Sequence, residues 1–321
     1  MKQTPKTGKR KSLTVLNTLL AIILALMLCA TALAHALMNK MNRVEDPSSA
    51  DLNGNLSAES DASRDDLLGA EKSIVNIMLI GQDRREGEDR ARSDAMILLT
   101  INKNTKSVTL TSFLRDLYVQ IPGYGGNRLN ASYAYGGMDL LNRTMEENFG
   151  IYIDGNVEVD FSQFSQIVDL LGGVDMDLRA DEANQINTDV GGSLTEGMQH
   201  LSGEQALTYV RIRKLDADGD FSRTQRQRNL INAMIRQLKD AGLVKLLGIV
   251  DDVLPMVTTD MSNTEILGYA TALLPMLAGA NIANQRIPAD GSYSYASVDG
   301  MSVLKADMDA NREILRQALG G

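Results

Sequence analysis

Five arginines fall within eighteen residues of a chain that is acidic overall, with a formal net charge of −9. They lie in the stretch YVRIRKLDADGDFSRTQRQRNLI and are Arg211, Arg213, Arg223, Arg226 and Arg228. A guanidinium is charged at any physiological pH, and its planar fork of donors matches the oxygens of a phosphate group. Such a concentration indicates either a solvated surface or a binding site for an anion.

Arg211 and Arg213 stand two residues apart in VRIRK. In an extended segment two such side chains point the same way, whereas in a helix they diverge by about 200°. Ser202 and Gln205 form a capping box that predicts the start of a helix. If both arginines serve one site, that helix must end near Tyr209. Taken alone, the pair fits the polar face of a surface strand more simply.

The stretch DFSRTQRQRNLI predicts a second helix, with Ser222 as its N-cap and an end at about residue 241. Arg223, Arg226 and Gln227 would then share one face. The start of a helix disfavours cations unless an anion binds there, so this pattern favours an anion site. The alternative is a set of ion pairs with the preceding aspartates, Asp216, Asp218 and Asp220.

Two further charged stretches follow apolar runs that predict strands. GQDRREGEDRARSD follows the first run and carries Asp83, Arg92 and Asp94, while Arg115 and Asp116 follow the third run. Open α/β sheets bind ligands at the carboxyl ends of their strands. The two carboxylates of the first stretch are ligands that a hard divalent cation prefers. By composition alone, a charged surface loop explains that stretch more simply.

The elements that would position these residues alternate between strands and helices. This alternation predicts one α/β domain over residues 73–319, with a central mixed sheet flanked by helices. The strands at 95–102 and 107–113 are expected to pair as a hairpin. The predicted strands are 74–81, 95–102, 107–113, 156–161, 174–178, 282–288 and 293–298. The predicted helices are 138–149, 162–171, 202–208, 222–241, 243–256, 262–278 and 309–319.

The N-terminus predicts a membrane anchor. Five basic residues and no acid occupy the first eleven positions, and residues 13–38 are apolar and uncharged with a neutral histidine. About 20 apolar residues span a bilayer, and positive charge marks the cytoplasmic side. We therefore expect a cytoplasmic tail at 1–12, a transmembrane helix at 13–38 and a flexible extracellular linker at 39–72. The alternative is a cleaved signal peptide, because ALA and AHA resemble cleavage sites. Both place the main body outside the cell.

Composition excludes several classes of protein. The basic tail leaves the rest of the chain strongly acidic, which argues against a nucleic-acid partner. Cys29 is the single cysteine of the sequence, so an intramolecular disulfide and thiol catalysis outside the membrane are both excluded. His200 is the one histidine outside the apolar segment, and we expect it at the surface. These features fit a bacterial surface protein with a self-sufficient core.

Taken together, the motifs resemble the LytR–CpsA–Psr family of bacterial cell-wall ligases. The resemblance covers about residues 74–238, in order and spacing: IMLIGQDRR, RSDAMILLTIN, VTLTSFLRDLYVQIPG, LNASYAYGG, VDLLGGVDMDL, GMQHLSGEQALTYVRIRK and GDFSRTQRQRNLI. It implies an α/β fold whose mixed sheet and helices enclose an apolar pocket for a polyprenyl chain. It further implies a phosphotransferase that moves an anionic glycopolymer, such as wall teichoic acid or capsule, from a polyprenyl-diphosphate carrier to peptidoglycan.

The resemblance also assigns roles to residues. The expected diphosphate-binding residues are Arg92, Arg115, Arg211, Arg213, Arg223 and Gln227. Magnesium, or manganese in its place, is expected on Asp83 and Asp94. The expected catalytic set is Asp94, Arg115 and Asp116, with Asp94 or Asp116 assisting deprotonation of the acceptor.

Some residues of the same motifs are expected to have no part in the chemistry. Arg226 and Arg228 are expected on the helix surface, and residues 216–220 form a loop rather than a metal site. Leu114 stands where the family often has proline, a change expected to cost little. Two other functions stay open: a polyprenyl-phosphate-binding regulator and a pyrophosphatase that acts on polyprenyl diphosphate.

Overall fold

The structure is a computed structural model. It describes residues 36, 38–44, 67–71, 73–84, 90–216, 218–240, 249, 251–277 and 282–319. The chain divides into two compact units, Met1–Met41 and Asn42–Gly321, and all elements below belong to the second. Among the described residues, no helix is both long and apolar enough to cross a membrane. Apart from Ala36 and Met38, the predicted span 13–38 lies outside these residues.

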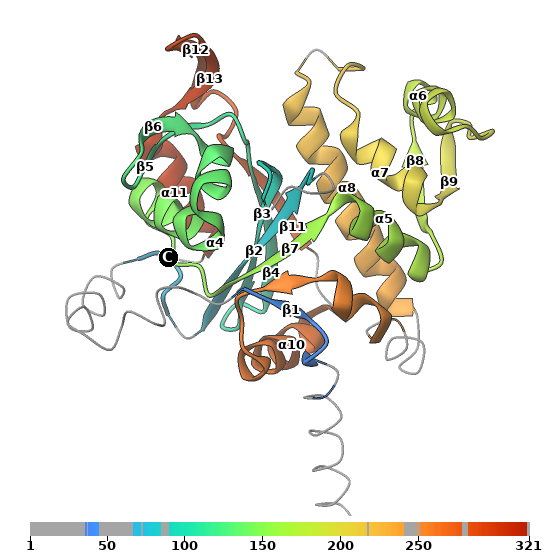
Figure 1. Ribbon diagram of the computed structural model, residues 1–321, viewed down its shortest axis with the longest axis horizontal. Coiled ribbons are helices and arrows are strands. Elements are labelled where there is room, and N and C mark those ends of the chain that lie inside the picture. The colour runs from blue at the N-terminus through green and yellow to red at the C-terminus, as the bar shows by residue number, and fades with distance from the viewer. Residues whose placement is uncertain are drawn as a thin grey trace, which may run out of the picture. The chain divides into compact units, whose positions relative to one another are not determined.

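A seven-stranded mixed sheet forms the centre of the second unit (Figure 1). Three neighbouring strands are antiparallel, and parallel strands flank them on both sides. This confirms the predicted α/β class and the predicted hairpin. In sheet order the strands are β1 (Asn42–Arg43), β10 (Thr258–Thr259), β7 (Gly155–Asp160), β2 (Ile74–Gln82), β3 (Ser93–Asn102), β4 (Ser107–Phe113) and β11 (Ile282–Ile287).

The strand directions bring three charged segments to one edge of the sheet. β2 and β7 are parallel, β3 is antiparallel to β2, and β4 is antiparallel to β3. The carboxyl ends of β2, β4 and β7 therefore meet the start of β3. Asp83 follows β2, Asp94 lies at the start of β3, and Arg115 comes two residues after β4. Topology alone thus collects the predicted acids and the first arginine.

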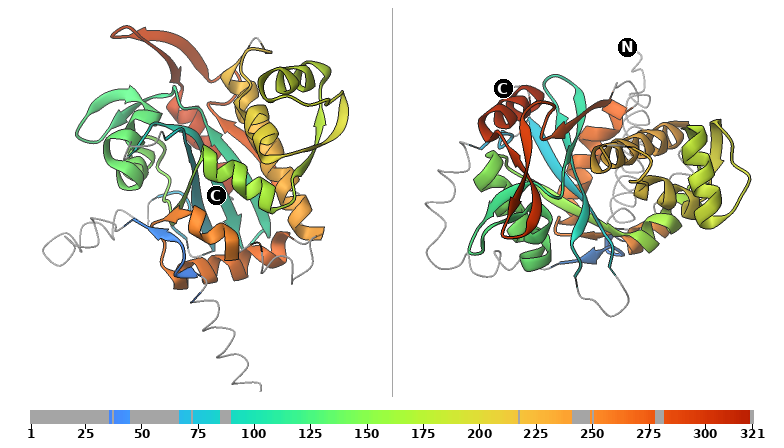
Figure 2. Two further views of the ribbon diagram at one scale, coloured as in Figure 1. Left: turned by 45° about the vertical axis from the view of Figure 1, so that its right-hand side comes forward. Right: turned by 90° about the horizontal axis from the view of Figure 1, so that it is seen from above.

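Helices cover both faces of the sheet (Figure 2). On one face, α4 (Leu129–Phe149) and α11 (Met308–Leu319) contribute to a core with apolar strand residues such as Met78 and Leu98. On the other face lie α8 (Asp220–Asp240) and α10 (Asn263–Leu277). The capping box of Ser262 and Glu265 opens α10 as expected.

Helix α4 begins nine residues before the predicted 138–149 segment. It is kinked at Gly137, where φ is +67°, and it ends at Gly150 in the left-handed conformation. Glycine tolerates both conformations because it lacks a Cβ. The predicted segment is therefore the second half of a longer, bent helix with the predicted terminator.

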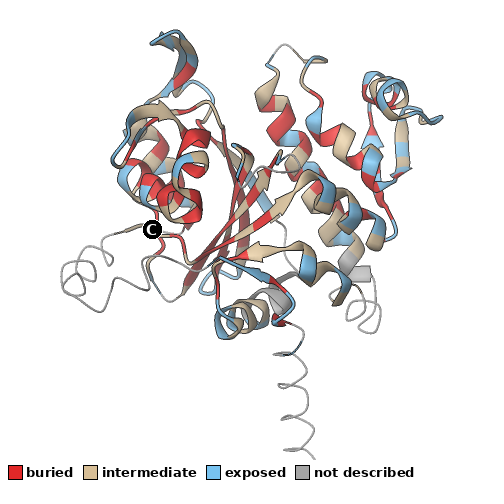
Figure 3. Ribbon diagram, in the orientation of Figure 1, coloured by how far each residue is buried: buried red, intermediate tan, exposed pale blue. Residues whose placement is uncertain are grey.

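A second apolar cluster lies to one side of the sheet (Figure 3). It joins α8 to α5 (Phe161–Leu170), β8 (Val174–Leu178), α6 (Ala180–Val190), β9 (Gly197–Leu201) and α7 (Gly203–Arg211). The sequence predicted α5, β8 and α7 but neither α6 nor β9. Helix α5 begins one residue before the predicted 162–171 segment, because Asp160 is its N-cap. His200 lies on β9 and is exposed, as expected.

Two small hairpins complete the fold. β5 (Tyr118–Ile121) pairs with β6 (Gly125–Arg128), and β12 (Tyr293–Val298) pairs with β13 (Met301–Ala306). Within the predicted linker 39–72, Asn42–Arg43 form edge strand β1, and Leu68 bridges to Ile151. The predicted helix 243–256 lies partly outside the described residues, and its last three form a 3-10 turn, η1 (Leu254–Met256).

Candidate diphosphate site

The connection between α7 and α8 decides how the arginines are presented. Helix α7 continues to Arg211, two residues past the expected end at Tyr209. Ile212 then leaves the helical conformation, with φ −58° and ψ 128°. Arg211 is therefore the last residue of a helix, and Arg213 follows a break in direction. The requirement that both lie in one extended segment was wrong, yet both reach the same edge of the sheet.

Helix α8 begins at Asp220, so the prediction of Ser222 as N-cap was wrong. The hydroxyl of Ser222 donates to Asp218 at 2.6 Å, and the Phe221 amide donates to the Asp218 carbonyl at 2.9 Å. These contacts start the helix earlier than the capping-box pattern suggested. The amide of Arg223 already donates to Gly219 at 3.0 Å. The backbone amide of Arg223 is therefore already hydrogen-bonded, and only the side chain of Arg223 can bind a ligand.

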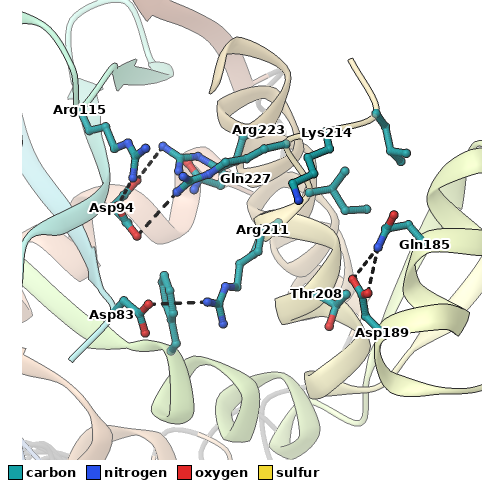
Figure 4. Close-up of a pocket in the computed structure, with 15 residues that line it drawn as sticks. Asp83, Asp94, Arg115, Gln185, Asp189, Thr208, Arg211, Lys214, Arg223 and Gln227 are labelled. Carbon is teal, nitrogen blue, oxygen red and sulfur yellow. Dashed lines mark hydrogen bonds and ion pairs between the residues drawn. The ribbon is translucent and has the colours of Figure 1, made fainter. Parts of the chain in front are cut away.

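A cavity of about 690 Å³ opens between these arginines and the edge of the sheet (Figure 4). Arg115 donates to Asp94 at 2.7 Å, Arg213 lies 3.8 Å from Asp94, and Arg211 lies 3.6 Å from Asp83. We call Arg115, Arg211, Arg213 and Arg223 the arginine clamp. The predicted residues that line this cavity are Asp83, Asp94, Arg115, Arg211, Arg213, Arg223 and Gln227.

Asp220 links three members of the clamp, so the alternative of ion pairs with the preceding aspartates is confirmed for this residue. Its carboxylate lies 3.2 Å from Arg115 and 3.6 Å from both Arg213 and Arg223. Burial alone would raise the pKa of Asp220, but the positive charges of these arginines outweigh burial and lower it. No sequence spacing distinguishes Asp220 from its acidic neighbours. Its position in the first turn of α8 brings its carboxylate close to the three arginines.

Arg223 is the most deeply buried member of the clamp, with a side chain only 3% exposed. Its Nε and Nη1 receive no hydrogen-bond partner from the described residues, and neither does Oε1 of the neighbouring Gln227. Burial, together with the guanidinium groups of Arg115 and Arg213, lowers the pKa of Arg223 to about 10. A buried cation with unused donors is costly unless an anion satisfies it. This is the arrangement expected of an anion site.

Two predicted residues lie outside this cavity. Arg92 is exposed, just before β3, and is not among the lining residues. Asp116 borders a different, smaller cavity and lies 3.6 Å from Arg115. The lining residues that the sequence did not predict include Lys214, and Phe161, whose ring lies 4.9 Å from the guanidinium carbon of Arg211. Phe161 was unforeseeable as a site residue because it reads as the end of an apolar strand.

Arg226 and Arg228 are buried, so their expected place on the helix surface was wrong. Arg226 donates to Glu182 at 2.8 Å, to the Ile212 carbonyl at 3.2 Å and to Asp216. Asp216 also accepts from Arg179 at 2.8 Å. We call Arg179, Glu182, Asp216 and Arg226 the ion-pair network. The network ties α6 and α8 to the loop between α7, which ends at Arg211, and α8, which carries Arg223.

Arg228 is buried in a different way from Arg226. Its Nη2 donates to Gln225 at 2.6 Å, but its Nε and Nη1 have no partner among the described residues. Burial, with repulsion from Arg286, lowers the pKa of Arg228 to about 10. It does not line the cavity.

Three of the described aspartates line the cavity: Asp83 and Asp94 at the edge of the sheet, and Asp189, which accepts from Gln185. The first two are the carboxylates predicted to hold a cation. Among the described residues, no group of three or more His, Cys, Asp or Glu side chains gathers as a metal site. Mg²⁺ is commonly bound by one or two carboxylates, with substrate phosphates and waters completing its six ligands. The two acids therefore fit Mg²⁺ bound together with a phosphorylated substrate.

Comparison with known proteins decides the family. The model of the LytR_cpsA_psr family matches residues 30–318. The chain belongs to this family. The polyisoprenyl-teichoic acid–peptidoglycan teichoic acid transferase TagU of Oceanobacillus iheyensis is 35% identical over 282 residues, 84% of each chain.

Two solved structures carry ligands and share the fold. TagT bound to LI-WTA aligns with a TM-score of 0.64 and 30% identity, over 78% of this chain and 92% of that one. The LytR-CPS2A-psr family protein YwtF (TagT) with bound octaprenyl pyrophosphate lipid aligns with a TM-score of 0.59 and 28% identity. That alignment covers 77% of this chain and 89% of the other. The mixed α/β fold expected from the resemblance is confirmed.

Proposed function

We propose that this chain transfers an anionic glycopolymer from a polyprenyl-diphosphate carrier to peptidoglycan. The observation that carries this proposal is the arginine clamp, which gathers four guanidinium groups around one cavity, opposite the carboxylates of Asp83 and Asp94. A diphosphate is the ligand whose charge density suits such a site. The name of the relative TagU describes this transfer, and the TagT relative was solved with octaprenyl pyrophosphate.

The clamp acts by position and charge. Arg115, Arg213 and Arg223 approach the cavity from the end of β4 and from both sides of the α7–α8 loop, so they can hold oxygens of both phosphates. Phosphoryl transfer depends mainly on positioning and on stabilising negative charge, and it needs no nucleophilic triad. Unused donors on Arg223 would be satisfied as the diphosphate enters. These residues therefore bind the donor and stabilise the charge that develops on the leaving phosphate.

Asp83 and Asp94 would hold Mg²⁺ against the diphosphate. When bound, the ion would neutralise part of the phosphate charge and polarise the phosphoryl group. The two acids otherwise pair with Arg211, Arg115 and Arg213, so the same carboxylates also set the orientation of the clamp.

The face of the sheet that α10 covers offers a path for the polyprenyl chain. Leu79, Leu99 and Val157 are only partly buried there, although they lie on central strands. Leu79 lies on β2, four residues before Asp83, which follows that strand, so this apolar surface leads away from the clamp. An apolar lipid chain covering it would gain about 25 cal/mol per Å² of apolar surface removed from water. The protein would then act at the extracellular face of the cell membrane, with residues 13–38 as its anchor.

The decisive experiment supplies the full-length protein with a lipid-linked teichoic acid precursor and peptidoglycan glycan strands. Transfer of labelled polymer is measured for the wild type, Arg115→Ala and Arg211→Ala. We expect both variants to lose transfer by about 100-fold, in line with loss of a charge that stabilises the transition state. Arg143→Ala is the matched control, because Arg143 is 57% exposed and pairs only with Asp139 among the described residues.

The other outcomes identify the alternatives. Unchanged transfer in both clamp variants would contradict the clamp. Tight binding of the lipid diphosphate without turnover by the wild type would indicate a regulator. Release of lipid phosphate without any glycan acceptor, at the rate seen with it, would indicate a pyrophosphatase. Replacing Asp83 or Asp94 by asparagine is expected to raise the Mg²⁺ concentration needed for transfer.

A further inference from the structure

A second cavity, of about 260 Å³, lies beside the clamp. Its walls come from the segment after β4, the start of α8 and the β12–β13 hairpin. The hairpin projects beyond the edge of the sheet at which the clamp lies (Figure 1). The cavity is large enough for one sugar ring and too small for a lipid chain.

Arg115 separates the two cavities. Its Nη1 donates to Asp94, which lines the larger cavity, while its Nε lies 3.6 Å from Asp116, which lines the smaller one. Asp220 borders the smaller cavity and pairs with the clamp at the same time. A group bound in the smaller cavity would therefore lie one side chain away from a diphosphate held by the clamp.

Tyr295 forms an exposed aromatic wall of the smaller cavity. Tyr295 is 68% exposed, which is unusual for so large an aromatic residue. It contacts Tyr293 edge-on at 5.9 Å, and Tyr293 stacks on Phe221 at 4.9 Å. This row of rings connects the hairpin to the first turn of α8. The apolar face of a sugar ring packs on such an aromatic surface.

Backbone contacts hold the hairpin against the Asp116 segment. The amide of Leu304 donates to the carbonyl of Asp116 at 2.9 Å. Arg128 donates to the carbonyl of Ser302 through Nε at 3.0 Å and through Nη2 at 2.6 Å. The aromatic wall and the Asp116 carboxylate are therefore fixed relative to each other, as a binding site requires.

The Asp116 carboxylate has an oxygen available to a ligand. Its Oδ1 is buried and accepts no hydrogen bond from the described residues, although Arg128 Nε lies 3.4 Å away as an ion pair. Burial raises the pKa of Asp116, and nearby Asp220 reinforces the shift against the opposing charge of Arg115. By contrast, Asp94 is held by Arg115 at 2.7 Å and faces Arg213. Asp116 is the better placed of the two to accept a proton.

The charge around the smaller cavity selects among sugars. Asp116, Asp218 and Asp220 all border it, whereas arginines border the larger one. An acidic rim repels the phosphate-bearing repeats of an anionic glycopolymer and accepts hydrogen bonds from the hydroxyls of a neutral sugar. The acceptor glycan fits this cavity better than the polymer of the donor.

We propose that the smaller cavity binds one neutral sugar ring of the peptidoglycan acceptor, stacked on Tyr295, with a hydroxyl directed at Asp116. This inference rests on the proposed transferase function. The hydroxyl oxygen bonds to the phosphorus that carries the glycopolymer, and the bond from that phosphorus to the bridging oxygen breaks. The hydroxyl proton passes to the Asp116 carboxylate, and polyprenyl phosphate leaves.

The test measures transfer kinetics and acceptor binding with the full-length protein. Tyr295→Ala is expected to raise the KM for an uncrosslinked glycan-strand oligomer roughly five- to tenfold, the loss of one aromatic contact, with the KM for the lipid-linked donor unchanged. Tyr295→Phe keeps the ring and should behave as wild type. Asp116→Asn is expected to lower kcat about 100-fold and leave the acceptor KM within twofold. Tyr124→Ala, at another exposed tyrosine that lines neither cavity, is the control and should change nothing.

Direct binding of the glycan oligomer, measured by calorimetry without donor, separates this inference from the proposed function. If the wild type transfers no polymer but binds the oligomer and Tyr295→Ala does not, the function fails and the sugar site stands. If the wild type transfers polymer while Tyr295→Ala keeps its acceptor KM and affinity, the inference is overturned. A rise in donor KM for Tyr295→Ala, or equal losses in Tyr124→Ala, overturns it as well.

Discussion

The arginine clamp and the ion-pair network use the same residue type on the same helix for opposite purposes. Arg223 and Arg226 are three residues apart on α8, and both are almost fully buried. Arg226 makes hydrogen bonds to Glu182, Asp216 and the Ile212 carbonyl. Arg223 makes one long hydrogen bond, 3.4 Å to the Asp94 carbonyl, and leaves Nε and Nη1 without partners among the described residues.

The difference teaches how to distinguish a structural arginine from a binding one. A buried guanidinium whose donors are all occupied stabilises the fold and has little left to offer a ligand. A buried guanidinium with unused donors is maintained at a cost in stability, and such costs concentrate at functional sites. Unused donors indicate binding only where they border a cavity, since Arg228 has them too but does not line the cavity at the clamp. The network holds the α7–α8 loop in place, and this fixes the positions of Arg213 and Arg223 in the clamp.

The largest effect is expected on stability, from Arg226→Ala. The change would leave the buried carboxylates of Glu182 and Asp216 without their main partner. Breaking a buried ion pair typically costs about 3–5 kcal/mol. Urea denaturation of the full-length protein, followed by circular dichroism, measures this cost. A loss below about 1 kcal/mol, the ordinary effect of a surface substitution, would contradict the structural role of the network.

A smaller effect, confined to binding, is expected from Arg223→Ala. Charge-assisted hydrogen bonds contribute about 1.5–3 kcal/mol, so the Kd for a polyprenyl diphosphate should rise roughly 10- to 100-fold. Stability should stay equal or increase, because the variant no longer buries an incompletely paired cation. Equilibrium binding and denaturation on the same samples test both statements. The distinction between the two arginines would be contradicted if Arg223→Ala lost as much stability as Arg226→Ala while keeping its affinity for the diphosphate.

The smallest effect is expected in the dependence of stability on pH. Burial alone would raise the pKa of Asp216, but hydrogen bonds from Arg179 and Arg226 outweigh it and lower the pKa. A lowered pKa contributes stability above the unfolded value of about 3.9, and this contribution is lost as pH falls through the folded value. Wild type should therefore lose its advantage over Asp216→Asn on acidification. Asp116, whose pKa is raised, should show the opposite trend. The free energy of unfolding of Asp116→Asn should increase relative to that of the wild type as pH rises.

Much of the fold and part of the site could be predicted from the sequence. Apolar runs and glycine terminators located the central strands and the end of α4, because these signals act over a few neighbouring residues. The motifs also predicted seven site residues that the structure brings to one cavity, among them Asp83, Asp94 and Arg115. The elements that the sequence did not predict include α6 and β9, which are polar and exposed over much of their length and so carry little apolar periodicity. They also include the short strands β5, β6 and β13.

The sequence by itself determined that this protein concentrates arginine in an acidic chain and that these arginines belong to known family motifs. The resemblance already separated Arg223 from Arg226, but only the tertiary structure decided that both are buried and which partners each one has. Arg223 and Arg226 share residue type, charge and helix. Glu182 of α6 accepts a hydrogen bond from Arg226, whereas Nε and Nη1 of Arg223 make no hydrogen bond to the described residues. Asp220, likewise, is one of several aspartates until the fold places it among three guanidinium groups. Pairing depends on residues distant in the chain, so no local pattern can encode it.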